Sequence, residues 1–163
     1  MHIEIERTLR EGGRFEAIVP IEPLAWEPGR EILAEGVRID GILTRRRRGI
    51  DLDARLTGRL SLECVRCLAT FEQPLCVDFH LVLVPAAVEP HSGESQIQPA
   101  DCDLFACEGG RIDLMTVARE QICLQVPLKP LCREACRGLC ARCGEDLNRG
   151  ACSCKESAGL RLV

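Results

Sequence analysis

The feature that most constrains this chain is a cysteine-rich stretch near its C-terminus, residues 131–154. It holds six cysteines, Cys132, Cys136, Cys140, Cys143, Cys152 and Cys154. Such density is typical of a disulfide framework or of zinc binding. The run from Cys140 to Gly144 favours zinc, because two sulfurs with two residues between them can converge on one ion and the glycine allows a positive φ. We therefore predict one tetrahedral site from the last four cysteines; the alternative is free thiols or disulfides in a flexible tail.

The expected compartment supports metal binding over disulfides. Residues 1–10 are charged and contain no apolar targeting region, and no apolar run approaches the ~18 residues that a membrane helix needs. We expect a cytosolic protein without a membrane partner. Cytosolic thiols stay reduced, so the cysteines are interpreted as metal ligands.

Composition limits the classes of partner. The chain has 163 residues, is 46% hydrophobic but only 3% aromatic, and carries a formal net charge of −4. Each Cys₄–zinc site would add two more negative charges. An acidic chain is not a general nucleic-acid binder, so any contact with RNA must use a local basic patch. With few aromatic residues, such a contact would depend on phosphates rather than on base stacking.

Alternating apolar residues predict a mainly antiparallel β structure. Short strands are expected at 3–5 and 15–21, and longer ones at 37–44, 50–64 and 71–84. The two strands within 37–62 are expected to form a hairpin. Its tip carries four consecutive basic residues, Arg45, Arg46, Arg47 and Arg48.

A second C-x-x-C pair, Cys64 and Cys67, follows the longest predicted strand. We expect it at the turn between two antiparallel strands, where a metal would hold the turn rigid. Two ligands cannot close a tetrahedral site, so this pair needs two partners from elsewhere. Residues 85–110 are predicted to be a mobile loop, in which Cys102 and Cys107 are loose thiols.

One principal helix is predicted at about 114–126, with Asp113 as its N-cap and Pro127 after its end. It leads into the cysteine-rich stretch. We therefore expect an α+β fold, a mainly antiparallel sheet or partial barrel with one principal helix and a C-terminal zinc-knuckle segment. The predicted division is a β-rich domain at 1–130 and a zinc-binding tail at 131–163 packed on it.

Eight cysteines in four pairs would make two Cys₄ zinc sites. We favour Cys64 and Cys67 with Cys132 and Cys136, and the last four closing among themselves, because short ligand loops cost the least closure entropy. The alternative joins 132/136 with 140/143 and leaves 64/67 to meet 152/154. The predicted ligands are Cys64, Cys67, Cys132, Cys136, Cys140, Cys143, Cys152 and Cys154.

Three blocks resemble the YceD-like family, also called large ribosomal RNA subunit accumulation proteins. They are SLECVRCLATF (61–71), RIDLMTVAREQICLQVPLKPLC (111–132) and CRGLCARCGEDLN (136–148), followed by a closing C-x-C. The resemblance covers roughly 36–154 in broken blocks. It implies a cytosolic protein of bacterial or organelle origin without known catalysis, tied to accumulation of 23S ribosomal RNA. Its motifs fall on Arg66 and on the eight cysteines of the four pairs.

Three functions remain open. The first is a non-enzymatic factor in large-subunit biogenesis, with structural zinc and 23S ribosomal RNA or the pre-ribosomal large subunit as partner. Its candidate RNA contacts are Arg45, Arg46, Arg47, Arg48, Arg66 and Arg142; the alternative is a solvated tip, with knuckle arginines that only offset thiolate charge. The second is a zinc-stabilised adaptor for a ribosomal or assembly protein. The third is a thiol redox enzyme using Cys64 and Cys67, which would need an exposed, acidic, metal-free thiol.

Overall fold

The computed structural model describes residues 1–20, 24–27, 30–34, 36–47, 49–86 and 103–154. The chain divides into two compact units. The sheet unit is Met1–Ser61 with Glu72–Val126, and the cysteine unit is Leu62–Phe71 with Pro127–Val163. The turn carrying the first C-x-x-C pair thus groups with the cysteine-rich stretch. The two-domain division drawn from the sequence, with its boundary at 130, stays a prediction.

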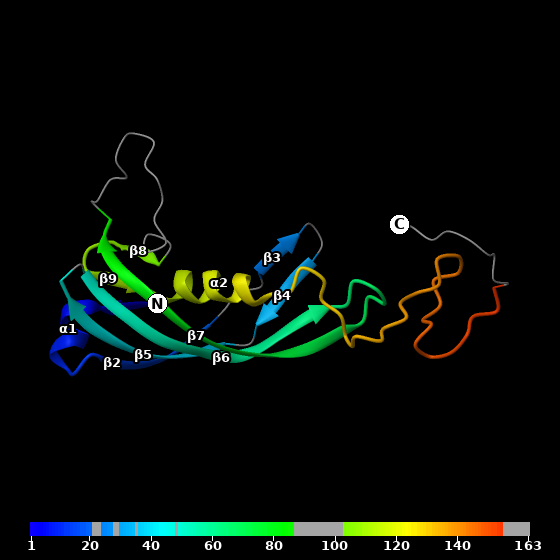
Figure 1. The fold of residues 1–163 in the computed structure, drawn as a ribbon, viewed down its shortest axis with the longest axis horizontal. Coiled ribbons are helices and arrows are strands. Elements are labelled where there is room, and N and C mark those ends of the chain that lie inside the picture. Colours follow the sequence, from blue (N-terminus) through cyan, green and yellow to red (C-terminus); the bar gives the residue numbers. More distant parts are fainter. Residues whose placement is uncertain (21–23, 28–29, 35, 48, 87–102, 155–163) are drawn as a thin grey trace, which may run out of the picture. The chain divides into compact units, whose positions relative to one another are not determined.

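The described strands form two sheets. The larger has seven strands in the order β2-β5-β6-β4-β3, with β7 beside β6 and β8 beside β7, and the smaller pairs β1 with β9. The long strands curl into a half-barrel (Figure 1). The strand bounds are β1 His2–Glu4, β2 Arg14–Val19, β3 Leu24–Glu27, β4 Arg30–Ala34, β5 Val37–Arg46, β6 Gly49–Glu63, β7 Thr70–Pro85, β8 Leu104–Cys107 and β9 Arg111–Asp113.

The predicted hairpin is confirmed as β5 and β6, which pair antiparallel from Arg38↔Thr57 to Arg46↔Gly49. The alternation that predicted β6 matches its burial. Leu52, Ala54, Leu56 and Leu60 are buried on one face, whereas Asp53, Arg55 and Arg59 on the other face are exposed. Burying each of these leucines stabilises the fold by about 1.5–3 kcal/mol. The apolar alternation therefore sets which face of the sheet meets the core.

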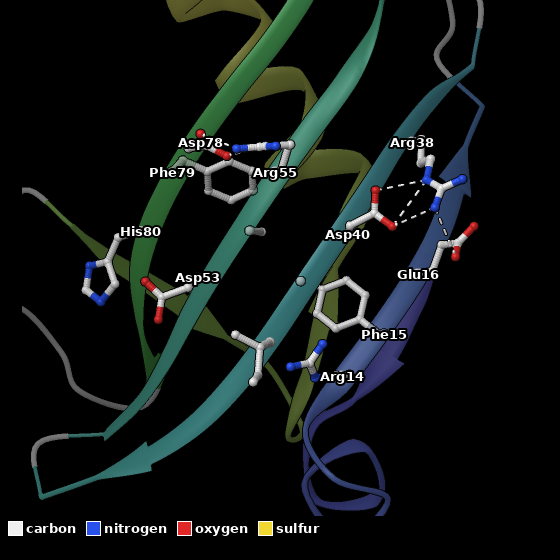
Figure 2. A pocket seen from close by; sticks show the side chains of 13 residues that line it. Arg14, Phe15, Glu16, Arg38, Asp40, Asp53, Arg55, Asp78, Phe79 and His80 are labelled. Atoms are coloured by element: carbon white, nitrogen blue, oxygen red, sulfur yellow. Dashed lines mark hydrogen bonds and ion pairs between the residues drawn. The ribbon is translucent and has the colours of Figure 1, made fainter.

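The predicted helix is α2, Leu114–Gln125, and its N-cap is as expected. Asp113 accepts hydrogen bonds from the backbone N of Met115 at 3.1 Å and from Oγ1 of Thr116 at 3.0 Å. The fully buried residues Leu114, Val117, Ala118 and Ile122 form its apolar face. Figure 1 shows α2 along the inner side of the curved long strands, and in Figure 2 it passes behind them, so this face closes the aliphatic core of the sheet unit.

The N-terminal segment differs from the sequence-based expectation. The predicted strand at 3–5 ends at Glu4, and a short helix, α1 (Ile5–Arg10), follows. Its first turn is supported by a 2.9 Å hydrogen bond from Oγ1 of Thr8 to the carbonyl of Glu4. An alternation of three residues is too short to distinguish a strand from the start of a helix.

The prediction of a mobile loop at 85–110 was wrong for residues 104–107, which form the strand β8. There β8 pairs parallel with β7, from Val82↔Leu104 to Pro85↔Cys107. Cys107 is a free thiol outside both groups of clustered cysteines, but it is buried, and burial raises the pKa of its thiol. Residues 87–102, with Cys102, lie outside the described residues.

Neither described helix is long and apolar enough to cross a membrane.

Candidate metal centres

The first group of cysteines combines a turn with a distant segment. Cys64 and Cys67 lie on the turn between β6 and β7, and Cys132 and Cys136 lie on the segment after α2. Their four Sγ atoms all lie within 4.8 Å of one another. Two of the separations, Cys64–Cys136 and Cys67–Cys132, are 3.7 Å each. We call these four residues cluster A.

Backbone hydrogen bonds hold the turn of cluster A in shape. The N of Cys64 donates to the carbonyl of Ala69 at 2.9 Å, and the N of Leu68 donates to the carbonyl of Cys64 at 2.9 Å. Leu68 has a φ of 59°, the left-handed conformation that closes the turn. The N of Val65 donates to the carbonyl of Pro130 at 3.0 Å, which joins the turn to the segment that supplies the other two sulfurs.

The second group is local in sequence. Cys140, Cys143, Cys152 and Cys154 place their Sγ atoms within 4.8 Å of one another, and we call them cluster B. The Sγ atoms of Cys140 and Cys152 are 3.5 Å apart. Gly144 has a φ of +75°, as its position after the C-x-x-C pair predicted, and its N donates to the carbonyl of Cys140 at 2.9 Å.

The sulfur separations match a tetrahedral zinc site and exclude disulfides. A disulfide needs sulfurs about 2.05 Å apart, whereas a tetrahedron with Zn–S bonds of about 2.3 Å has sulfurs about 3.8 Å apart. The separations of 3.5–3.7 Å between Sγ atoms in the two clusters fall near the second value. All eleven described cysteines are free thiols. Four thiols per cluster also suit a soft cation, so the residues present fit zinc.

The structure brings the cysteines together in the grouping that short loops favour, not in the alternative grouping. Their role as zinc ligands stays a prediction.

The two clusters differ in burial. In cluster A, Cys64 is fully buried and Cys136 is 3% exposed, with Phe71, Leu131 and Leu139 packed around them. In cluster B, Cys143 is exposed and the other three cysteines are half-buried. Solvent therefore reaches cluster B more easily.

Each cluster contains one acidic thiol. At Cys64, burial acts to raise the pKa, but backbone N–H donors from Cys132, Cys67 and Arg66 outweigh it and lower the pKa to about 6. At Cys140, the backbone N–H groups of Cys143 and Arg142 lower the pKa to about 6. These donors stabilise negative charge on sulfur, as N–H groups around a metal-bound thiolate do.

Each cluster also contains a thiol that resists ionisation. Burial first, and then hydrogen bonding to the other cysteines of cluster A, raises the pKa of Cys132 to about 12. The hydrogen bond with Cys143, followed by burial, raises the pKa of Cys154 to about 12. Four thiolates so close repel one another, so a cation is what would let all four ionise together.

Arg66, a candidate RNA contact, is engaged within the cysteine unit. Its Nη1 donates to the carbonyl oxygen of Cys136 at 2.8 Å and lies 3.5 Å from that of Glu134. Its own carbonyl accepts from the N of Leu139 at 3.0 Å. Gly138 lies against this carbonyl, and a Cβ there would be 2.9 Å from the oxygen. Arg66 thus links the turn of cluster A to the segment that carries Cys136. The only sign of this role in the sequence was an arginine between the two cysteines of the turn.

The arginines of the hairpin tip are partly neutralised. Arg45 pairs with Glu6 at 2.5 Å and Arg46 with Asp51 at 3.3 Å. Arg47 is exposed and has no ion pair among the described residues, and Arg48 lies outside them. Arg142 is exposed on the loop of cluster B. The RNA-binding role of all six arginines stays a prediction, and within the described part of the tip Arg47 is the best placed.

A second charged surface lies on the outer face of the sheet, in an open hollow of about 1020 Å³ (Figure 2). Two of its three arginines are paired with acids on the same or neighbouring strands, and the third is Arg14. Arg38 bonds Asp40 at 2.9 Å and pairs with Glu16 at 3.2 Å, and Arg55 bonds Asp78 at 2.6 Å. The Arg38–Glu16 and Arg55–Asp78 pairs link neighbouring strands, whereas Arg38 and Asp40 lie on the same strand. Four acids line the hollow beside three arginines, so this face is not a basic patch.

Comparison with known proteins places both clusters inside a single match. Residues 52–160 match the family described as "Large ribosomal RNA subunit accumulation protein YceD". Proteins named "Large ribosomal RNA subunit accumulation protein YCED homolog 1, chloroplastic" are 29% identical over 136 residues in Zea mays and 24% identical over 139 in Arabidopsis thaliana. These alignments cover 69% and 72% of this chain, but 46% and 43% of the relatives.

A third relative, an uncharacterized protein of Mycobacterium leprae (strain TN), is 31% identical over 85 residues, 52% of this chain and 37% of its own length. The chain thus spans less than half the length of the curated relatives it matches. No solved structure matches it.

Proposed function

The chain belongs to the YceD family, described as large ribosomal RNA subunit accumulation proteins, and from this membership we propose that it is a non-enzymatic factor in large ribosomal subunit biogenesis. It supports the accumulation of 23S ribosomal RNA, and two structural zinc ions hold its cysteine unit together. The observation that carries the proposal is the family match over residues 52–160, which includes all eight cysteines of both clusters.

Zinc in these clusters would be structural. Cluster A would hold one ion with Cys64, Cys67, Cys132 and Cys136, and cluster B another with the remaining four cysteines. Four protein ligands fill a tetrahedral zinc ion, and catalytic zinc keeps one position open for water or substrate. Metal in cluster A would therefore cross-link the turn to the segment after α2. Metal in cluster B would make the following loop rigid.

A thiol redox role receives little support from the geometry. Such an enzyme needs an accessible thiolate beside a resolving thiol. Cys64 has a lowered pKa, but it is fully buried and shares its cluster with three other sulfurs. The acidic thiol is thus placed for metal binding rather than for attack on a disulfide.

The second candidate function is a zinc-stabilised adaptor for a ribosomal or assembly protein. It is favoured by two exposed leucines of the cysteine unit, Leu68 at 53% and Leu128 at 91% exposure. Large exposed apolar side chains suit a protein partner better than a phosphate backbone. Salt dependence separates the two partners, since phosphate contacts weaken steeply with salt and an apolar interface does not.

The proposed function is tested by depletion and complementation in the source organism. Depletion should lower the ratio of 23S to 16S ribosomal RNA, and the intact gene should restore it. A Cys64→Ser variant should fail to restore the ratio, whereas Cys76→Ser, which changes an exposed cysteine outside both clusters, should restore it. A ratio that does not change on depletion would refute the proposed function.

A further inference from the structure

The loop of cluster B reaches into the surroundings of cluster A through one side chain, Asn148. Asn148 lies between Cys143 and Cys152 in sequence, yet its Nδ2 donates to Sγ of Cys136 at 3.5 Å. Cys136 is a member of cluster A. One residue carried by the ligand loop of one cluster therefore touches a sulfur of the other.

The orientation of the Asn148 amide is fixed by its other partners. Its Oδ1 accepts from the backbone N of Arg137 at 2.8 Å and from Nη2 of Arg133 at 2.9 Å. Its Nδ2 and its backbone N both donate to Oδ1 of Asp146, at 2.6 and 2.9 Å. Because two donors occupy the oxygen and a carboxylate oxygen takes one hydrogen of the amide, the N–H side must face Cys136.

The segment that carries Asn148 is tied to the first half of cluster B. The N of Cys140 donates to the carbonyl of Glu145 at 2.8 Å, and the N of Leu147 donates to the carbonyl of Gly138 at 2.9 Å. Leu139 and Asp146 form an isolated antiparallel bridge. Cys143 precedes Asn148 and Cys152 follows it, so a metal that holds these two sulfurs together would also hold the loop on which Asn148 lies.

From these contacts we infer that Asn148 is a positioning residue that couples the two clusters, so that metal in cluster B raises the metal affinity of cluster A. The inference rests on the metal-binding part of the proposed function. A donor to a metal-bound thiolate stabilises its charge and orients the ligand, and loss of such an outer contact typically lowers metal affinity about 10–100-fold. Coupling is reciprocal, so metal in cluster A raises the affinity of cluster B by the same factor.

The test measures the zinc affinity of each cluster in the full chain, reduced and metal-free at the start, by competition with a chelator of known affinity. Asn148→Ala should weaken cluster A about 10–100-fold, although Asn148 is not a ligand. Arg137→Ala is the matched control, because it keeps the backbone N–H that Asn148 accepts and should leave the affinity unchanged. Asn148→Asp keeps the acceptor but puts a carboxylate toward Cys136, so it should weaken cluster A at least as much.

Coupling is separated from local damage by a double-mutant cycle. In a Cys143→Ser, Cys154→Ser background, which disables cluster B, cluster A should already be weakened and Asn148→Ala should add little further loss. Replacing zinc by ¹¹³Cd gives a second readout. In the NMR spectrum the cluster A resonance should move in Asn148→Ala, a change that loss of stability alone does not produce.

The outcomes distinguish this inference from the proposed function. Two metal ions bound to the wild-type chain, with cluster A affinity and ¹¹³Cd resonance unchanged by Asn148→Ala, would overturn the coupling and leave structural zinc intact. An equal loss of affinity with and without a working cluster B would also overturn it. A wild-type chain that binds no zinc would refute the metal sites themselves, and the coupling with them.

Discussion

The guanidinium of Arg66 donates a 2.8 Å hydrogen bond to the carbonyl oxygen of Cys136, 70 residues further along the chain. This hydrogen bond links the turn that carries Cys64 and Cys67 to the backbone of the segment that carries Cys132 and Cys136. It acts beside the contacts between the sulfurs themselves. The arginine between the two cysteines of the turn therefore serves the geometry of the site. An RNA contact through Nη1 of Arg66 would compete with this hydrogen bond.

Elemental analysis of protein purified under reducing conditions should find two zinc ions per chain. Each cluster offers four thiols at the spacing of a tetrahedral zinc site. A stoichiometry near zero, with all twelve thiols of the chain freely reactive, would contradict both sites. A single ion would show that only one cluster binds.

Cys64→Ser and Cys132→Ser should each destabilise the zinc-loaded protein by roughly 4 kcal/mol or more, the range expected for loss of a structural metal. Because both residues belong to cluster A, the double variant should lose little more than either single one. Denaturant unfolding measures all three. Additive losses would mean that the two residues do not share a metal, and Cys76→Ser provides the control outside the clusters.

A chelator should remove metal from cluster B before cluster A. Cys143 is exposed, whereas Cys64 and Cys136 are 0% and 3% exposed. Timed alkylation after chelator addition, with the modified cysteines identified by mass spectrometry, follows the order of release. The expectation fails if Cys64 and Cys136 are labelled as early as Cys143.

Gly138→Ala should destabilise the cysteine unit by about 1–3 kcal/mol. Gly138 has a φ of +76°, and a Cβ there would lie 2.9 Å from the carbonyl oxygen of Arg66. Gly150→Ala is the matched control, because no atom lies within 4 Å of its added Cβ and its φ is not in the left-handed region. Denaturant unfolding of the zinc-loaded variants should show the loss only for Gly138→Ala.

The hairpin tip can be tested in both directions for binding to 23S ribosomal RNA. Arg47→Gln should reduce the magnitude of the log–log salt slope by about 1, as expected for one lost phosphate contact. Glu6→Gln should strengthen binding at low salt, because it removes the acid that pairs with Arg45. If neither variant changes the affinity, the tip is solvated surface, and Arg142 or a protein partner becomes the better candidate.

The long regular elements could be predicted because their signals are local. The alternation of Leu52, Leu56 and Leu60 with exposed residues sets the face of β6, and Asp113 caps α2 as its position indicates. The short elements could not. β8 exists through parallel pairing with β7, and the four residues of Leu104–Cys107 carry no period that predicts it. α1 follows an alternation too short to exclude a continuing strand.

The sequence by itself determined the donors of the candidate site: eight cysteines in four close pairs, with a glycine where the C-x-x-C turn of cluster B needs a positive φ. Only the tertiary structure decided which pairs meet, and that Arg66, Gly138 and Asn148 surround cluster A. The reason is physical. Spacing of two or three residues controls whether two neighbouring sulfurs can converge, whereas the meeting of Cys64 with Cys136 depends on the path of all the chain between them.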